Sequence, residues 1–445
     1  MNHKVLKFLF VCLLGAQVCL SARPDEINFP LLYHVTTLAI FLFAGLIITF
    51  TQKSHPPWDN LTLVTGLFLV YFFTIGILIS VSSGLGLVET IKFPYRSSNL
   101  LMVLFLPLLV RKEEDLYWLF LALLWMMGCQ LAWDLYMAAT RQREALLDVL
   151  TGSEFASNMF LGTIPFAFAG LLIFWNVRRR RLLYLGLLLV LWTMLTLKLF
   201  LIYSRTVWLV ILPFDLMAVY FLLRKKFQLS KFFYKIKVVG RIIILLALMT
   251  IGAMTILVAY TPHVGNIIVK RFYFERGVEA RLSEYKTALN TWLESPISGV
   301  GFGHKVRLFK GTHTREQNFI HNFVMQFLMS SGMVGLSLLL AMLGVTTFQI
   351  MKLFKRSRTL LQTVILIAIV ITLANIVLMS LTETVINAQE VYFLEAIVIS
   401  FAISIKRLQR QDLLETIRMS KKNYTFGVKG VGNDTSFLGP RIMSK

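Results

Sequence analysis

The sequence contains repeated apolar runs that are long enough to cross a lipid bilayer as helices. A transmembrane helix needs about 20 consecutive, mainly apolar residues. The 445-residue chain is 57% hydrophobic and only 15% charged, whereas a soluble protein is expected to carry about 25% charged residues. We therefore predict an all-α integral membrane protein with about 12 transmembrane helices, and we exclude a soluble enzyme, a disordered protein and a disulfide scaffold. The predicted spans are residues 5–21, 30–50, 61–81, 98–110, 116–139, 155–176, 182–203, 206–223, 242–260, 319–350, 359–381 and 391–405.

Basic residues set the predicted orientation of these spans. Cytoplasmic loops retain Lys and Arg, and here such residues gather at 178–181, 224–241 and 352–358 and at both ends of the chain. Alternation of the spans places all of these segments on one side, so both termini are predicted to be cytoplasmic. The net charge of +22 is then mainly an orientation signal, assisted by anionic membrane lipid, and does not argue for a nucleic-acid partner. The first run also resembles a cleaved signal peptide covering residues 1–22, and this alternative stays open.

The loop lengths define the predicted domain organisation. Residues 1–405 form one polytopic transmembrane domain, and residues 406–445 form a basic cytoplasmic tail. Within the tail we expect a short amphipathic helix at 406–418 on the inner membrane surface and disorder beyond residue 421. The outward loops are short except for residues 261–318, between the ninth and tenth spans. Long loops in compact domains are usually functional, so we expect the chemistry there.

This long loop has predicted internal structure. Residues 279–294 predict an amphipathic helix, with apolar side chains at spacings of three and four, that ends before Pro296. The apolar positions are Leu282, Tyr285, Leu289 and Trp292. Residues 299–303, which we call the glycine segment, lack the strand–turn–helix context of a dinucleotide-binding loop. We therefore interpret the glycine segment as a tight turn and not as a phosphate cradle.

A lipid or polysaccharide transporter is the alternative from a different functional class. Transporters built from two six-span halves usually join them through the cytoplasm after the sixth span, but here that joint is only the short cluster 178–181. Transport pathways are also marked by ionisable residues within the bilayer, and these spans contain few. The layout therefore favours an enzyme with an outward-facing site.

Three basic residues on the predicted outward side are candidates for that chemistry. Arg205 lies in the turn between the seventh and eighth spans, Arg281 lies in the first turns of the loop helix, and His321, followed by Asn322, opens the tenth span. Arginines can clamp a diphosphate leaving group without a metal ion, and a neutral imidazole suits a general base. Each residue also has an ordinary interpretation: an interfacial anchor for Arg205, a solvated helix face for Arg281 and a neighbour of a helix cap for His321.

Other polar residues give weaker signals. Lys198 lies about two turns before Arg205 on the same helix face, where it either extends the basic site or pairs with Asp215. Arg96 faces outward and either contacts glycan or phosphate or anchors the chain at the interface. The chain has no Asp-x-Asp pattern, and its histidine spacing fits no usual zinc site, so we predict neither a metal nor a cofactor.

Three sequence segments together resemble a known family. They are residues 204–208 (SRTVW), residues 281–303 (an arginine, a tryptophan, a proline and the GVGFG run) and residues 321–335 (HN followed by GMVG). Their order, and the long loop between the ninth and tenth spans, are similar to those of the O-antigen ligase and polymerase family. The resemblance covers roughly residues 182–350.

The resemblance implies an architecture like that of C-type glycosyltransferases in the bacterial inner membrane, with a periplasmic active site. It implies transfer of a glycan from undecaprenyl diphosphate, with Arg205 and Arg281 on the diphosphate and His321 activating the acceptor hydroxyl. Lys198, Asn322 and Arg96 are further expected substrate contacts. Our first interpretation is an O-antigen ligase whose acceptor is the lipid A core. The close alternative is an O-antigen or exopolysaccharide polymerase, whose acceptor is a second lipid-linked glycan.

Overall fold

The structure is a computed structural model that describes seven stretches of the chain and a few single positions between 165 and 255. The stretches are residues 59–85, 97–140, 275–310, 313–317, 320–357, 359–382 and 389–429. The predicted spans at 5–21, 30–50, 155–176, 182–203, 206–223 and 242–260 lie outside these residues or include only single described positions. The total of twelve spans and the position of the long loop among them therefore stay predictions.

The described part of the chain is mostly helical, as the sequence predicts. Three of its helical stretches are long and apolar enough to cross a membrane: Asn60–Ser82, Phe323–Arg356 and Leu360–Leu381. This agrees with an all-α membrane protein. The elements in chain order are α3 (Asn60–Tyr71), the π-helix η1 (Phe72–Gly76), α4 (Ile77–Ser82), the 3₁₀-helix η2 (Ser98–Leu101), α6 (Met102–Leu109), α7 (Glu113–Thr140), α14 (Glu275–Glu294), β1 (Val306–Lys310), β2 (His313–Gln317), α15 (Phe323–Arg356), α16 (Leu360–Thr382) and α17 (Gln389–Lys429).

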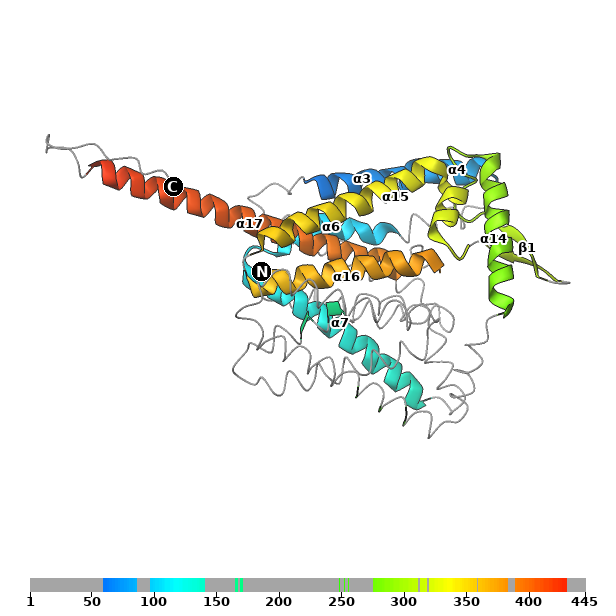
Figure 1. Cartoon of the computed structure of the whole chain (residues 1–445), viewed down its shortest axis with the longest axis horizontal. Helices are drawn as coiled ribbons and strands as arrows, with labels where there is room; N and C mark the ends of the chain where they lie inside the picture. The colour runs from blue at the N-terminus through cyan, green and yellow to red at the C-terminus, as the bar shows by residue number, and fades with distance from the viewer. Residues whose placement is uncertain are drawn as a thin grey trace, which may run out of the picture.

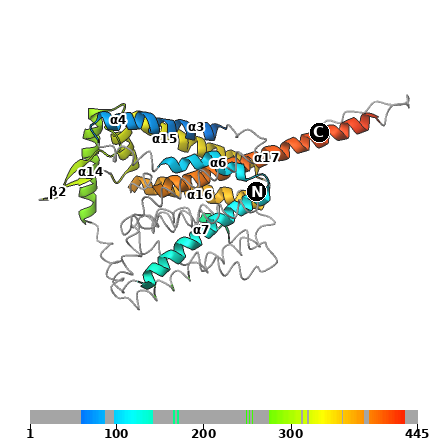
Figure 2. The same ribbon diagram turned by 180° about the vertical axis from the view of Figure 1, so that it is seen from behind.

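Most of the apolar helices lie side by side. Helix α15 packs against α3 and α16, and α17 packs against α6 and η2. Helix α14 crosses one end of this group and carries the β1–β2 hairpin beside it, whereas α17 extends past the opposite end (Figure 1). The view from behind shows the same arrangement (Figure 2). The elements of the predicted long loop are thus gathered at one end of the helices.

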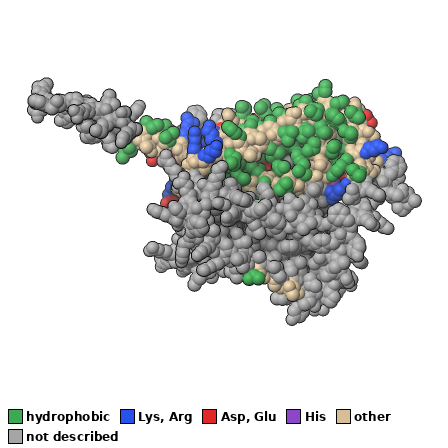
Figure 3. Space-filling view, viewed as in Figure 1, with side chains coloured by type: hydrophobic (Ala, Val, Ile, Leu, Met, Phe, Trp, Pro, Cys, Tyr) green, Lys and Arg blue, Asp and Glu red, His purple; other side chains and the backbone are tan. Residues whose placement is uncertain are grey.

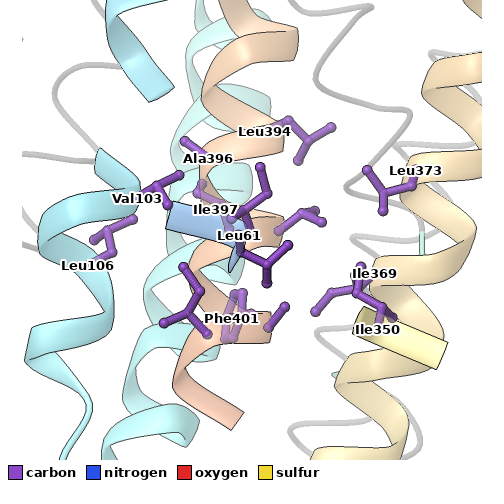
Figure 4. Packing of buried hydrophobic residues seen from close by; sticks show 14 of the residues in the cluster. Leu61, Val103, Leu106, Ile350, Ile369, Leu373, Leu394, Ala396, Ile397 and Phe401 are labelled. Atoms are coloured by element: carbon purple, nitrogen blue, oxygen red, sulfur yellow. The ribbon is translucent and has the colours of Figure 1, made fainter. Parts of the chain in front are cut away.

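Apolar side chains from most of the described apolar helices form the core between them. Leu61 of α3, Leu106 of α6, Ile350 of α15, Ile369 of α16 and Phe401 of α17 are all buried in one cluster (Figure 4). Close packing of this kind, and not withdrawal from water, is what holds helices together within a bilayer.

An apolar surface covers the outer side of the same group. On α3 the exposed side chains of Leu63, Leu67 and Val70 follow one another at helical spacing, and hydrophobic side chains spread over the face formed by α3 and α15 (Figure 3). Soluble proteins rarely expose apolar patches of this extent, whereas a lipid-facing surface requires them. This face therefore supports a position within a membrane.

Polar contacts join the helix ends opposite α14. Asp59 caps the first turn of α3 and forms an ion pair with Lys406 of α17. Thr359, before α16, donates to the carboxylate of Glu113 on α7, and Gln409 of α17 donates to the Leu353 carbonyl near the end of α15. Alternation of the predicted spans assigns all of these ends to one side of the membrane, and the structure brings them together.

Helix α15 differs from the predicted tenth span. The sequence predicts one run over residues 319–350, but the helix begins at Phe323 and is interrupted at Gly332, whose φ of 61° and ψ of −164° are not helical. The part after the interruption, residues 333–356, extends about 36 Å at 1.5 Å per residue, which is enough to cross the bilayer. The part before it packs along α14.

Two further expectations need correction. The amphipathic helix predicted at 406–418 is not a separate element, because α17 continues from the last predicted span without a break as far as Lys429. The disorder predicted beyond residue 421 was therefore wrong for residues 422–429. The β1–β2 hairpin was not predicted at all. Its strands pair antiparallel from Val306 opposite Gln317 to Lys310 opposite His313. The available signal was the sequence pair Gly311-Thr312, since two-residue connections that begin with Gly are typical of hairpins.

Candidate active site

Helix α14 provides one wall of the candidate site. The prediction of a helix ending at 294 is confirmed, although it begins four residues earlier, at Glu275. The predicted apolar face packs only in part: Tyr285 is half-buried against the protein, whereas Leu282 is 61% and Leu289 is 40% exposed. The buried residues are Glu284 and Ala288. A helix has 3.6 residues per turn, so the packed face is rotated away from the leucines.

The start of α15 provides the facing wall. Asn322 caps this helix: its side-chain oxygen accepts hydrogen bonds from the N–H groups of Val324 and Met325 at 2.9 and 3.2 Å. Its amide nitrogen donates to the carbonyl of Leu381, at the end of α16, at 3.0 Å. Capping satisfies N–H groups that have no partner within a helix. Asn322 therefore fixes the position of His321, the residue directly before it.

The two walls meet at His321. Its Nδ1 lies 2.7 Å from Oε2 of Glu284, and its backbone N–H donates to the same oxygen at 3.3 Å. The hydroxyl of Tyr285 donates to the His321 carbonyl at 3.0 Å. Ring and main chain of His321 are thus both held by neighbouring residues of α14, while 27% of the His321 side chain stays exposed.

The Glu284 carboxylate is almost fully buried, with 9% of its side chain exposed. Burial by itself raises the pKa of Glu284, but hydrogen bonds and electrostatic attraction from His321, together with a hydrogen bond from Gln317, outweigh burial and lower that pKa. A carboxyl group with a lowered pKa is ionised at neutral pH. The site therefore contains a buried negative charge directly against the histidine.

Arg281 lies on the same side of α14. It is half-buried and precedes Glu284 by three residues and Tyr285 by four, and side chains at these spacings are neighbours on a helix surface. The structure thus brings three of the predicted site residues, Arg281, His321 and Asn322, to one region. Arg205, Lys198 and Arg96 lie outside the described residues, and their roles stay predictions.

The glycine segment docks onto α15 next to its interruption. The N–H groups of Val300 and Gly301 donate to the carbonyls of Met329 and Ser330 at 2.9 and 3.0 Å. These donors are therefore used within the protein, and Gly299, Gly301 and Gly303 all have positive φ. The predicted turn is found at residues 302–303, and the N–H groups of Val300 and Gly301 bond to α15.

Two further hydrogen bonds satisfy main-chain N–H groups of the interrupted helix. Across the break, the N–H groups of Met333 and Val334 donate to the carbonyls of Pro296 and Ile297 at 3.0 and 3.3 Å. Non-helical backbone is tolerated at membrane depth only where protein satisfies its polar groups. Residues 296–301 supply those partners, which links the second and third sequence segments physically.

Tyr71 completes the support of the break from α3. Its hydroxyl donates to the carbonyl of Ser331 at 3.0 Å, and the π-helix η1 follows directly after it. The ring of Phe72 packs against those of Phe302 and Phe327. A predicted span outside the matched motifs therefore holds the site in place.

Changing Tyr71 to Phe is expected to destabilise the folded protein by about 1–3 kcal/mol, because the buried Ser331 carbonyl loses its partner while the ring packing is kept. The thermal midpoint of the purified protein in detergent measures this change. An unchanged midpoint would mean that the hydroxyl does not support the break.

The sequence alone did not identify Glu284, Tyr71 or Ser80. The hydroxyl of Ser80 donates a hydrogen bond to the Phe302 carbonyl at 3.4 Å. A glutamate in a charged helix usually faces solvent. The only available signal was its spacing of three residues from Arg281, which places both side chains on one face of the helix. Tyr71 and Ser80 lie more than 200 residues from their partners, so no local pattern signals these contacts.

Comparison with known families agrees with the geometry. Residues 189–340 match the family model described as O-antigen ligase, which confirms the resemblance inferred from the three segments and comes close to its predicted limits of 182–350. The matched region includes Arg205, Arg281 and His321. A search of curated proteins found no match to the chain.

Proposed function

We propose that this chain, whose residues 189–340 belong to the O-antigen ligase family, is an O-antigen ligase-type glycosyltransferase of the bacterial inner membrane. It transfers a polysaccharide from undecaprenyl diphosphate to the lipid A core on the periplasmic face, without a metal. The observation that carries this proposal is the convergence of Arg281, Glu284 and His321 within the matched region. Family members are membrane glycosyltransferase-like enzymes, either ligases or polymerases.

The proposed chemistry assigns one task to each group. His321 accepts the proton of the acceptor hydroxyl as its oxygen attacks the anomeric carbon of the donor sugar. The bond from that carbon to the diphosphate oxygen breaks, and the diphosphate leaves with the electron pair. Arg281 and Arg205 stabilise the charge on the leaving group, with Lys198, Arg96 and Asn322 as further substrate contacts. Attack opposite the leaving group inverts the anomeric carbon.

The polymerase is the second candidate, because the grouped residues act on the diphosphate and on an acceptor hydroxyl, and both kinds of acceptor provide such a hydroxyl. A strain lacking the gene distinguishes the candidates by the product that accumulates. A ligase predicts complete polysaccharide that is not joined to core, and a polymerase predicts single repeats still joined to core. Accumulation of donor on the inner leaflet would instead indicate a transporter and contradict the enzymatic proposal.

Replacing Arg281 by Ala is expected to lower kcat/KM for transfer about 10-fold to 100-fold, because a hydrogen bond to a charged group contributes about 1.5–3 kcal/mol. Arg281→Lys should recover only part of this, since an ammonium cannot bind a diphosphate bidentately. Activity is measured in proteoliposomes with lipid-linked donor.

The matched control is Lys286→Ala, which removes one positive charge from an exposed position on the same helix. Equal activities for Arg281→Ala and Lys286→Ala would remove Arg281 from the proposed mechanism.

A further inference from the structure

We infer that Glu284 is a positioning residue that fixes the tautomer and orientation of His321, so that Nε2 is the nitrogen that receives the acceptor proton. This inference deepens the proposed function and rests on it. It assigns a role to a buried carboxylate that the three sequence segments did not single out.

The geometry ties Glu284 to His321 at two points. One carboxylate oxygen of Glu284 lies 2.7 Å from the ring Nδ1 of His321, and it also accepts a hydrogen bond from the backbone N–H of His321 at 3.3 Å. The neighbouring Tyr285 holds the carbonyl of the same residue, and Gln317 donates to the carboxylate from β2. Rotation of the ring would therefore break the Nδ1 contact with a carboxylate that also binds the main chain of the same residue.

This arrangement selects one form of the imidazole. An ionised carboxylate can only accept hydrogen bonds, so the ring nitrogen beside Glu284 must carry its hydrogen. A neutral imidazole has one N–H and one lone pair, which leaves the lone pair on Nε2. The nitrogen remote from Glu284 is thus the one able to take a proton.

The same carboxylate acts after the proton has moved. When the acceptor oxygen bonds to the anomeric carbon and the diphosphate departs, the hydroxyl proton goes to Nε2 and the ring becomes an imidazolium. The negative charge of Glu284 then lies beside that cation in a buried environment, where electrostatic attraction is stronger than in water. Glu284 touches neither donor nor acceptor and acts only through His321.

Glu284→Gln tests the inference, because an amide keeps the size of the side chain and can offer an N–H to Nδ1, which favours the wrong tautomer. In the Ser-His-Asp triad of a serine protease the corresponding acid-to-amide exchange lowers kcat about 10⁴-fold. We expect kcat to fall at least 100-fold with little change in KM for the lipid-linked donor. Glu294→Gln, at the exposed end of the same helix, makes the same acid-to-amide change and should keep wild-type kcat.

A spectrum of the protein labelled with ¹⁵N-histidine provides a measurement that mere loss of packing would not give. The signal that disappears in His321→Gln should show a protonated Nδ1 and an unprotonated Nε2 in the wild type. In Glu284→Gln that signal should change. The wild-type spectrum tests the inference even if Glu284→Gln does not accumulate in the membrane.

The outcomes separate the two levels of the proposal. Activity in His321→Ala would overturn the proposed base. An inactive His321→Ala together with full kcat in Glu284→Gln, or a protonated Nε2 in the wild type, would overturn only the role of Glu284.

Discussion

Replacing His321 by Ala is expected to abolish glycan transfer, with kcat reduced about 10²-fold to 10⁴-fold. A general base must lie within hydrogen-bond reach of the proton that it removes, and His321 is held at the site by Glu284 and by Tyr285. Removing the imidazole leaves the attacking hydroxyl with water as its only base.

His321→Ala also leaves the buried Glu284 without its ring partner, which can destabilise the fold by itself. His321→Gln avoids this, because its amide can donate to Glu284 but is not a base. We therefore expect His321→Gln to accumulate in the membrane with a near wild-type thermal midpoint and to remain inactive in proteoliposomes. His304→Ala, a half-buried histidine that follows the glycine segment, is the control and should stay active. Transfer by His321→Gln at the wild-type rate would show that His321 is not the general base.

Replacing Gly332 by Ala is expected to prevent stable folding of the site. An added Cβ would lie 2.2 Å from the carbonyl oxygen of Ile297 and 2.7 Å from the backbone nitrogen of Gly299. Neither backbone atom can rotate away as a side chain can. The φ of 61° combined with ψ of −164° is also a conformation that is essentially limited to glycine. Strain and collision together should cost at least about 3 kcal/mol.

Gly344 offers a matched control on the same helix, because an added Cβ would meet nothing within 4 Å. Alanine in a helix interior is favoured over glycine by about 1 kcal/mol, so Gly344→Ala should be neutral or stabilising. Thermal midpoints in detergent and the amount of protein in the membrane measure both variants. A Gly332→Ala protein as stable as Gly344→Ala would show that the glycine segment does not dock on the break as described.

The sequence predicted the elements that depend on local pattern. Apolar runs located Asn60–Ser82 and Leu360–Leu381 to within one residue, and Pro296 marked the end of α14. Local pattern failed where a distant contact decides the outcome. The leucines of α14 predicted its packed face, but the charged Glu284 is buried instead, because His321, 37 residues later, satisfies it.

The candidate site followed the same rule. Arg281 and His321 were identified by residue type and position, whereas the glycines were recognised as turn residues without any indication of where the turn docks. Gly299 and Gly332 need each other, since each would place a Cβ against the backbone at or next to the other. A local sequence pattern identifies each glycine separately and does not indicate that the main chains at Gly299 and Gly332 are in contact.

The interruption of α15 has a consequence for how this region can vary. Every partner that residues 296–301 supply to the break is a main-chain group, so most side chains there are not required for the contact itself. The spacing along the chain is required, because loss or gain of one residue between Glu294 and Gly299 would move each N–H and carbonyl out of register with α15. We therefore expect this stretch to accept substitutions at Ser298, which makes only a weak contact with its neighbour, and to reject any change of length.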